Sequence, residues 1–388
     1  MNLLDLLLLL AALAFAVSGY RQGFIVGVLS FVGFLGGGFL GMWLLPKVYA
    51  NGSAGLRTPL VAIVAVLVAA TIGQVLAGWV GGRLRGAVTW RPARLLDAVS
   101  VVALLVTAWF LGTAVAQSPV PSLVRMVRGS EVLAAVGRVM PPEATVLFSS
   151  FRRVLDSSGF PEVFSGIRPE GIAAVGPPDP AVVSAPGLAA ARPSIVKVLG
   201  AARACNREVE GSGFVFAPER VMTNAHVVAG VTHPRVLVDG TGAGLPAQVV
   251  LFDPQTDLAV LYVPGLRRTP LAFRTDGRPG DSAIVAGYPK NGPFTAVPAR
   301  LRSEVRARGS DIYGQQPVTR EIYALRGDVE SGNSGGPLVA LDGRVYGVIF
   351  AKSVEDPQTG YALTAAQAAA DAGRGASATA PVPTGGCT

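Results

Sequence analysis

Long apolar stretches with almost no charge lie within the first 118 residues and constrain the fold more than any other feature of the sequence. Three of them run for 19 to 22 residues, enough for a helix to cross a bilayer. A shorter one precedes them, and the four stretches are Leu3–Tyr20, Phe24–Leu45, Pro59–Val80 and Ala98–Ala116. The sequence therefore predicts an N-terminal, all-α transmembrane domain of four helices in residues 1–118.

The first stretch is a candidate signal peptide, because Ala14-Phe15-Ala16 imitates a cleavage site. A signal peptide begins with a basic region, but nothing basic precedes Arg21, and Asp5 stands where a positive charge is needed. We therefore expect this stretch to remain as a membrane span.

Basic residues in the loops orient the spans, since cytoplasmic loops carry the excess of Lys and Arg. The first loop holds Arg21, the second holds Lys47 and Arg57, and the third holds four arginines. The first and third loops together are the more basic, which predicts that they are cytoplasmic. The sequence thus predicts a multi-pass protein of the inner (plasma) membrane whose residues after 118 lie on the periplasmic, extracytoplasmic side.

The net charge of +8 comes from 29 Arg and 4 Lys against 25 acidic residues. A basic domain that binds nucleic acid gathers its charge on one face or helix. Here the arginines are scattered or lie between apolar stretches. Membrane topology explains them better, so we expect the lipid bilayer as a partner and no nucleic acid.

Glycines recur every four residues in the second stretch, at Gly33, Gly37 and Gly41. Such a stripe lets another helix approach closely. Packing within the chain is the favoured interpretation, and oligomerisation is the alternative. With the turn Gly19–Gly23, the first 118 residues resemble the colicin V production (CvpA) membrane family.

Residues 119–193 differ in character from the preceding stretches. Leu147, Phe151, Val154 and Leu155 share one helical face, which predicts an amphipathic helix that packs on the membrane surface or on the next domain. Residues 176–193 are Pro, Ala, Gly and Val with few charges. This composition predicts an extended, exposed linker, and exposed linkers are where proteolysis concentrates. We expect self-cleavage there.

Short apolar runs broken by Gly, Pro and Asp fill residues 194–388. Strands this short and frequent predict an all-β sandwich or barrel. Only Thr364–Ala372 has a helical pattern.

Ser334 stands among small residues in "ESGNSGGPL". A serine hydroxyl becomes a good nucleophile only beside a base that is itself oriented by an acid. Of the two histidines, His226 ends an apolar run and His233 precedes a proline in a turn. Asp257 begins an apolar run, whereas Asp253 precedes a proline and fits a turn. The alternative is a Gly-Ser turn without function, which the presence of His226 and Asp257 disfavours.

The order His226, Asp257, Ser334 is the order of chymotrypsin-type enzymes. The motifs "TNAHV", "DLAVL" and "GNSGGPL" resemble the trypsin-like clan, and its bacterial HtrA-type branch in particular. The whole chain resembles the MarP-like family of actinobacterial, membrane-anchored acid-resistance serine proteases. This resemblance implies a chymotrypsin-like double β-barrel in residues 194–388. It also implies that Ser334 is the nucleophile, His226 the general base, and Asp257 the orienting acid.

The resemblance further assigns the oxyanion hole to the backbone N–H groups of Gly332 and Ser334. No cofactor and no metal are expected. Asn333 stands where trypsin-like zymogens carry Asp, so activation by pairing with a new N-terminus is not implied. The chain also leaves no room for the PDZ domain of many HtrA proteins.

The resemblance to trypsin-like enzymes also suggests substrate-binding residues, from their positions in the sequence relative to Ser334. Asp328 lies at the pocket-floor position of trypsin-like enzymes, where it favours Lys or Arg in the substrate; a surface turn is the alternative. Ile349, Phe350 and Ala351 are expected to form the pocket wall that pairs with the substrate.

Cys205 and Cys387 are the two cysteines of the chain. They are either unrelated buried thiols or one disulfide. The predicted topology places both outside the cytoplasm, where disulfides persist, so we expect a disulfide that pins the C-terminal tail.

These features together predict a membrane-anchored periplasmic serine endopeptidase that cleaves cell-envelope proteins. The resemblance implies a role in resistance to acid and oxidative stress. One rival is a protease fold that binds peptides without cleaving them and regulates a CvpA-like channel or secretion factor. In the other, the membrane half is itself the functional part.

Overall fold

The computed structural model forms two compact units, Met1–Leu155 and Asp156–Thr388. The predicted middle region 119–193 is therefore divided between them. The structure describes single positions between 26 and 41 and between 106 and 112, together with residues 2, 4–10, 57–85, 121–139, 163–164, 170–202, 205 and 207–388.

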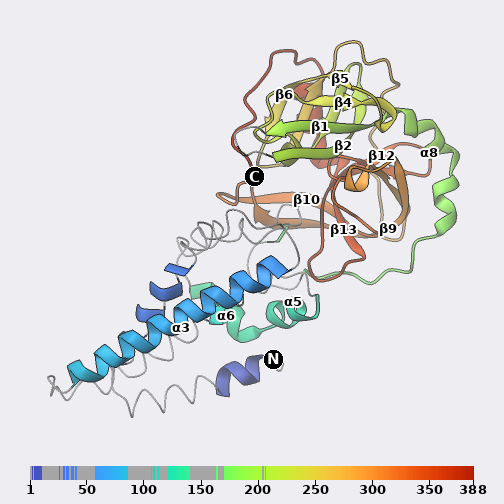
Figure 1. The fold of residues 1–388 in the computed structure, drawn as a ribbon. Helices are drawn as coiled ribbons and strands as arrows, with labels where there is room; N and C mark the ends of the chain where they lie inside the picture. The colour runs from blue at the N-terminus through green and yellow to red at the C-terminus, as the bar shows by residue number, and fades with distance from the viewer. Residues whose placement is uncertain are drawn as a thin grey trace. The chain divides into compact units, whose positions relative to one another are not determined.

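The first unit contains the helices α3 (Arg57–Arg85), α5 (Pro121–Arg128) and α6 (Glu131–Val139) (Figure 1). The helix α3 covers the predicted span Pro59–Val80. Most of the other three predicted spans, and the predicted helix around Phe151, lie outside the described residues. Within the described part of the chain, no helix has the length and apolar character needed to cross a membrane.

The glycine stripe packs within the chain. A Cβ atom added at Gly37 would lie 3.1 Å from the Cα of Ala70, and one added at Gly33 would collide with the backbone of Gly73. Ala70 and Gly73 belong to α3, so small residues on both helices allow their backbones to approach closely. The favoured prediction, packing within the chain, is confirmed.

Asp5 caps a helix that lies far away in the sequence. Its buried carboxylate accepts hydrogen bonds from Ser130 Oγ (2.5 Å) and from the backbone N–H groups of Glu131 (3.3 Å) and Val132 (3.1 Å). These N–H groups open α6 and have no acceptor within the helix. The first unit therefore extends at least to residue 139, beyond the predicted boundary at 118.

Seven strands form the first sheet of the second unit, in the order β5-β4-β1-β2-β3-β7-β6. Its core is built mainly from valines such as Val196, Val198 and Val221, whose branched side chains suit a pleated surface. The strands are β1 (Ile195–Ala202), β2 (Arg207–Ala217), β3 (Arg220–Thr223), β4 (Arg235–Leu237), β5 (Leu245–Pro246), β6 (Gln248–Asp253) and β7 (Leu258–Tyr262).

Six further strands close into a barrel in the order β10-β13-β12-β11-β8-β9 (Figure 1). They are β8 (Ser282–Gly287), β9 (Thr295–Ser310), β10 (Pro317–Arg326), β11 (Pro337–Ala340), β12 (Val345–Lys352) and β13 (Thr359–Thr364). The predicted β architecture is thus confirmed, with one barrel closed and the first sheet ending in the edge strands β5 and β6.

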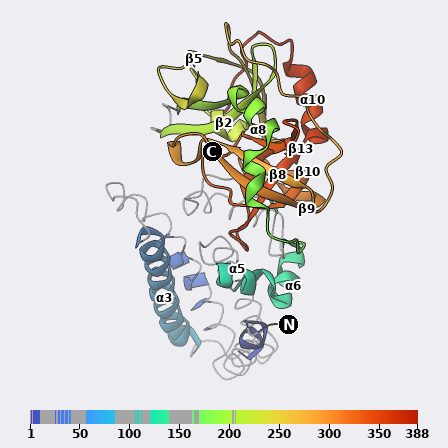
Figure 2. The ribbon, with the colours of Figure 1, turned by 90° about the vertical axis from the view of Figure 1, so that its right-hand side faces the viewer.

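Helix α10 (Ala365–Gly375) lies against strands of both sheets (Figure 2) and matches the predicted helix at 364–372. Thr364 caps it, accepting a hydrogen bond from Gln367 N at 3.0 Å. The prediction of a single helix in this part was wrong, because α9 (Ala225–Val228) follows β3. Short helical turns also occur at η3 (Arg192–Ser194), η5 (Val238–Gly240) and η6 (Pro289–Asn291).

The segment expected to be an exposed linker is folded onto the second unit. It forms η2 (Pro180–Ser184) and α8 (Pro186–Ala191). Val182, Leu188 and Ala191 are buried in the main core. The prediction of an unstructured segment over 176–193 was therefore wrong, because three apolar side chains at suitable spacing are enough to dock it.

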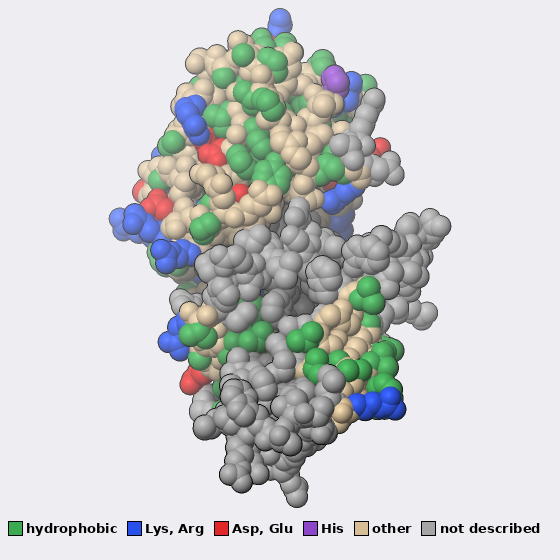
Figure 3. Space-filling model, turned by 90° about the vertical axis from the view of Figure 1, so that its left-hand side faces the viewer, with side chains coloured by type: hydrophobic (Ala, Val, Ile, Leu, Met, Phe, Trp, Pro, Cys, Tyr) green, Lys and Arg blue, Asp and Glu red, His purple; other side chains and the backbone are tan. Residues whose placement is uncertain are grey.

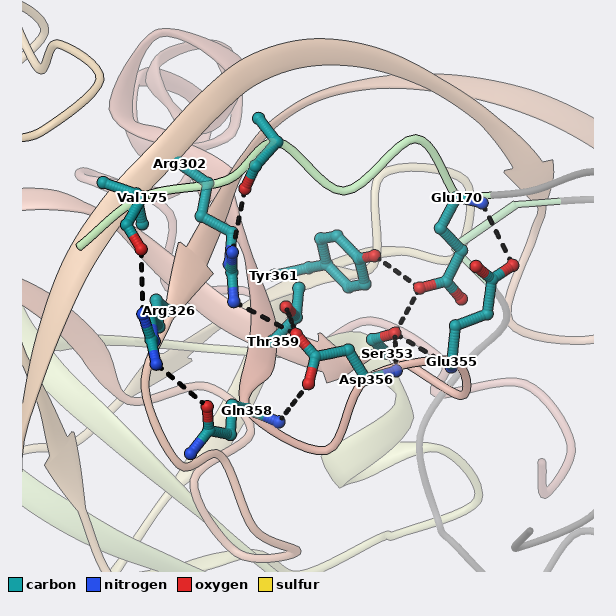
Figure 4. Close-up of polar contacts among 11 residues, drawn as sticks. Glu170, Val175, Arg302, Arg326, Ser353, Glu355, Asp356, Gln358, Thr359 and Tyr361 are labelled. Carbon is teal, nitrogen blue, oxygen red and sulfur yellow. Dashed lines mark hydrogen bonds and ion pairs between the residues drawn. The ribbon is translucent and has the colours of Figure 1, made fainter. Parts of the chain in front are cut away.

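Residues 170–176, here called the strap, precede η2 in the chain and lie against the closed barrel, called the second barrel below (Figure 4). Two barrel arginines each bind a backbone carbonyl of the strap with one nitrogen and the loop 353–358 with the other. The bonds join Arg302 to Ala173 O (2.8 Å) and Asp356 (3.1 Å), and Arg326 to Val175 O (2.9 Å) and Gln358 (3.3 Å). The strap and this loop are thus fixed together.

Glu170 begins the strap and binds the same loop. Its carboxylate accepts hydrogen bonds from Tyr361 Oη (2.7 Å) and from Ser353 Oγ, while its N–H donates to Glu355 Oε1 (3.1 Å). Burial, followed by the nearby Glu170 carboxylate, raises the pKa of Tyr361. The tyrosine therefore stays protonated and keeps donating to Glu170.

Basic side chains are dispersed over the described surface. On the face shown in Figure 3, blue Lys and Arg side chains stand apart on neutral and hydrophobic surface. Some pair with acids, as Arg306 does with Glu321 at 2.9 Å and Lys290 with Glu330 at 2.6 Å.

Cys205 and Cys387 form a disulfide, with their Cα atoms 6.5 Å apart and 182 positions between them in sequence. This confirms the predicted bond. The tail also forms backbone bonds to the first sheet region, from Gly230 N to Thr384 O (3.1 Å) and from Val382 N to Val249 O (2.8 Å). The C-terminus is thereby held beside the segment that follows α9.

Replacing Cys205 by Ser should lower the free energy of unfolding by up to roughly 4–5 kcal/mol, because the bond closes a long loop in the unfolded chain. Turnover should fall as well, since the tail supports the segment after α9. Urea unfolding and peptide hydrolysis measure the two effects, and Cys387→Ser must reproduce both. Free thiols at both positions in protein from the envelope, detected in a non-reduced digest, would contradict the bond.

Candidate active site

The pairing of β3 with β7 brings two of the predicted site residues together. Thr223 pairs with Ala259 in this antiparallel register. Three residues after Thr223 comes His226 in α9, and two residues before Ala259 stands Asp257. As a result, His226 Nδ1 lies 2.8 Å from Asp257 Oδ2 and 3.0 Å from Oδ1. The carboxylate is fully buried, so this contact is shielded from solvent.

The backbone of Asp257 is held in a conformation that is rare for a residue with a side chain, with φ at 67°. Its N–H donates to Asp253 O at 3.0 Å, and its carbonyl accepts from Asn224 Nδ2 at 2.8 Å. Its Oδ1 also accepts the N–H of His226 at 3.0 Å. Such strain is retained where the surroundings determine the geometry, as they do in active sites.

Asp253 has the turn role expected from the sequence. Its carboxylate accepts the N–H groups of Gln255 (2.9 Å) and Thr256 (3.0 Å). His233 is exposed and contacts Thr232 Oγ1 at 2.9 Å. Neither residue belongs to the cluster around Ser334.

Arg320 extends from β10 towards the residue before Asp257. It is almost fully buried, and its Nε donates to Thr256 O at 3.2 Å. Burial lowers the pKa of Arg320, while the charges of Asp257, Asp311 and Asp253 act in the opposite direction. A buried cation from β10 therefore interacts electrostatically with the carboxylate of Asp257, and sequence patterns gave no sign of it.

Ser334 lies in the loop between β10 and β11, which strand β12 holds in place. Gly335 N donates to Ile349 O (2.8 Å), and Ile349 N donates to Gly336 O (2.9 Å). The serine is buried. His226 Nε2 is buried too and has no hydrogen-bond partner in the described part of the structure. Catalytic hydrogen bonds are often long without substrate and shorten when substrate binds.

The backbone before Ser334 forms a tight turn. Asn333 N donates to Glu330 O at 2.9 Å, and Gly332 has φ of 93°, which matches the third position of a type II turn. A Cβ atom at Gly332 would lie 2.5 Å from Tyr288 O, so only glycine fits. Among the described residues, the N–H groups of Gly332 and Ser334 donate to no acceptor.

Asn333 takes part in the turn through its side chain. Its Oδ1 accepts the N–H of Glu330 at 2.9 Å. An amide that binds the local backbone gives the loop its shape without the ion pair that an aspartate makes in zymogen activation.

The predicted substrate-binding residues differ in burial. Ile349, Phe350 and Ala351 are buried in β12, and Ile349 contacts the loop of Ser334 directly. Asp328 is exposed. A pocket-floor charge is enclosed by its pocket, so this position favours the surface-turn interpretation of Asp328.

Three polar residues at the site escaped the sequence analysis: Ser212, Thr223 and Asn224. All three are fully buried. Two signals were available: the small motif Gly211-Ser212-Gly213, which indicates a close approach of backbone, and the motif "TNAHV", which contains Thr223 and Asn224 next to His226. In the described part of the chain, no cluster of three or more His, Cys, Asp or Glu side chains is placed to hold a metal ion.

Comparison with known proteins agrees with this geometry. Residues 211–348 match the model of a trypsin-like peptidase domain, and residues 4–141 match that of the colicin V production protein. Serine protease Rv3671c of Mycobacterium tuberculosis is 40% identical over 392 residues, covering 99% of this chain and 98% of the relative. The chain belongs to this family of serine proteases.

Further relatives share the protease half. The crystal structure of the active form of the Rv3671c protease is 45% identical, with a TM-score of 0.55, over 58% of this chain and 99% of that one. A probable periplasmic serine endoprotease, DegP-like, of Brucella suis is 39% identical over 36% of this chain and 27% of its own length. The chain is thus a serine endopeptidase of the MarP-like family, with a colicin V production domain and a trypsin-like peptidase domain.

Ser334→Ala and His226→Ala should each reduce kcat by roughly 10⁵- to 10⁶-fold, and the double variant should be hardly slower, because triad members act as a unit. Asp257→Asn should lose as much or less. Peptide hydrolysis measures the rates, and circular dichroism verifies folding. Near-normal turnover by His226→Ala would contradict the assignment.

Proposed function

We propose that the protein is a membrane-anchored serine endopeptidase that cleaves cell-envelope proteins on the extracytoplasmic side. The observation that carries the proposal is the buried His226–Asp257 pair, with Nδ1 and Oδ2 at 2.8 Å, in the same unit as the glycine-built turn that ends at Ser334.

In this proposal, Ser334 Oγ attacks the scissile carbonyl, and His226 Nε2 takes its proton and later gives it to the leaving amine. Asp257 holds Nδ1–H and stabilises the imidazolium. The N–H groups of Gly332 and Ser334 bind the oxyanion as it develops. The buried strand at Ile349–Ala351 forms the pocket wall beside this loop, to which both backbone groups of Ile349 are bonded.

The long apolar stretches, the distribution of arginines and the family's colicin V production domain support anchoring in the plasma membrane. The disulfide supports an oxidising, extracytoplasmic compartment for the protease unit. A role in resistance to acid and oxidative stress rests on the resemblance to the MarP-like family. The proposed substrates are proteins of the same compartment.

A fluorophosphonate probe tests the proposal, because it labels only an activated serine. We expect the wild type to be labelled at Ser334, and His226→Ala, which keeps the serine, to remain unlabelled. In envelope extracts, Ser334→Ala should retain proteins that the wild type cleaves. Equal labelling of wild type and His226→Ala would show that the serine is not activated by the histidine.

The alternative is a regulator that binds peptides without cleaving them and acts on a CvpA-like channel or secretion factor. The observation in its favour is that His226 Nε2 has no partner within the described structure, Ser334 included. The same probe separates the two functions: a wild type that binds peptides but is never labelled would support the regulator. Transport by the first unit, Met1–Leu155, alone would favour the membrane half as the functional part.

Self-cleavage ahead of the first strand is also part of the proposal, but the docked helix α8 protects its segment. Leu188→Asp should release α8 by placing a charge in the core, and the wild-type serine should then cut between residues 182 and 191. Ala190→Asp is the matched control, since Ala190 is exposed on the same helix. Intact mass follows the cut, and equal cutting in Leu188→Asp with Ser334→Ala would point to another protease.

A further inference from the structure

Ser212 joins the first sheet to the loop that carries the nucleophile. It lies on β2 between two glycines and is fully buried. Its N–H donates to Ser334 O at 2.8 Å, and its own carbonyl accepts from Thr223 Oγ1 at 2.8 Å. A residue of the His226–Asp257 sheet thus holds the backbone of the serine in the other barrel.

The hydroxyl of Ser212 makes two more bonds to the same region. It accepts the N–H of Tyr288 at 2.8 Å and donates to Gly332 O at 2.6 Å. A carbonyl only accepts and an N–H only donates, so the single hydroxyl proton must point at Gly332. The carbonyls of Gly332 and Ser334, the two residues whose N–H groups form the proposed oxyanion hole, are therefore both bound by Ser212.

Three glycines leave the room that Ser212 occupies. A Cβ atom at Gly287 would lie 2.5 Å from its Oγ, and one at Gly336 would lie 3.1 Å from its Cβ. A Cβ atom at Gly335 would collide with its carbonyl oxygen. Part of the glycine-rich surroundings of Ser334 is thus explained by the approach of Ser212.

We propose that Ser212 is a positioning residue for the oxyanion hole, a role that rests on the proposed functions of Gly332 and Ser334. Without the hydroxyl, Gly332 O and the N–H of Tyr288 would remain buried without a partner. Glycine at 332 has a wide choice of conformations, so the turn would then leave the geometry that directs its N–H towards the oxyanion.

The test compares Ser212→Ala with Ser194→Ala in the full chain. Ser194 is the matched control, because it is also buried and its Oγ donates to a carbonyl, that of Thr269, at 2.5 Å. For Ser212→Ala we expect kcat to fall by roughly 10- to 100-fold, less than the 10²- to 10³-fold loss of an oxyanion donor itself. KM should stay within about twofold, because the oxyanion forms only after substrate binds.

A peptide boronate, which resembles the tetrahedral intermediate, supplies the second measurement. Its affinity for Ser212→Ala should fall by the same factor as kcat, and its affinity for Ser194→Ala should be unchanged. If Ser212 had only a structural role, Ser212→Ala and Ser194→Ala would both have a lower thermal stability. The two variants would then have the same kcat and the same affinity for the boronate.

If the wild type is active, either of two results would overturn the role of Ser212 and leave the proposed function intact. One is an equal kcat in the two alanine variants, and the other is a raised KM with an unchanged kcat in Ser212→Ala. If Ser212→Ala does not fold, Ser212→Cys carries the test, because its somewhat larger thiol still fills the site but donates only weakly. Wild-type kcat in that variant would contradict the role. A wild type without Ser334-dependent hydrolysis would overturn the proposed function and this proposal together.

Discussion

Hydrogen bonds between the first sheet and the nucleophile loop are the interactions on which the site depends. His226 in α9 and Asp257 in the turn before β7 lie beside the first sheet, whereas Ser334 lies in a loop of the closed barrel. No strand pairing therefore sets the distance between the imidazole and the serine hydroxyl. The bond from Ser212 N to Ser334 O and the contact of Arg320 with Thr256 O span this division. One sheet holds the His226–Asp257 pair and the closed barrel holds the loop of Ser334, and these bonds fix the two relative to each other.

Much of the site was predictable because its chemistry allows few residue types. The chain has two histidines, and Ser334 stands in the motif "GNSGGPL", so few combinations were possible. The order of the motifs then indicated the chymotrypsin-type arrangement. The disulfide was predicted because the predicted membrane topology places both cysteines outside the cytoplasm. The strands followed from short apolar runs, which reflect the period of a pleated sheet rather than any distant contact.

The rest depends on contacts between residues far apart in sequence. Asp5 caps a helix 126 positions away, and Glu170 reaches Glu355 across 185 positions; no local pattern carries such information. Residues 176–193 were misjudged for a related reason. Their composition resembles that of a flexible linker, but Val182 and Leu188 find places in the core, and tertiary packing overrides the composition.

The strap places the start of the protease unit earlier in the chain than the first β-strand suggests. Arg302 is largely buried, and burial lowers its pKa, so the carbonyl of Ala173 is one of the few partners that keep its charge solvated. A protease unit that began at residue 194 would lose the hydrogen bonds from Arg302 to Ala173 O and from Arg326 to Val175 O, at a cost of about 0.5–1.5 kcal/mol for each bond that water replaces. The protease unit therefore begins ahead of its first strand, and a displacement of the strap would also displace the loop 353–358, because Arg302 and Arg326 bind both.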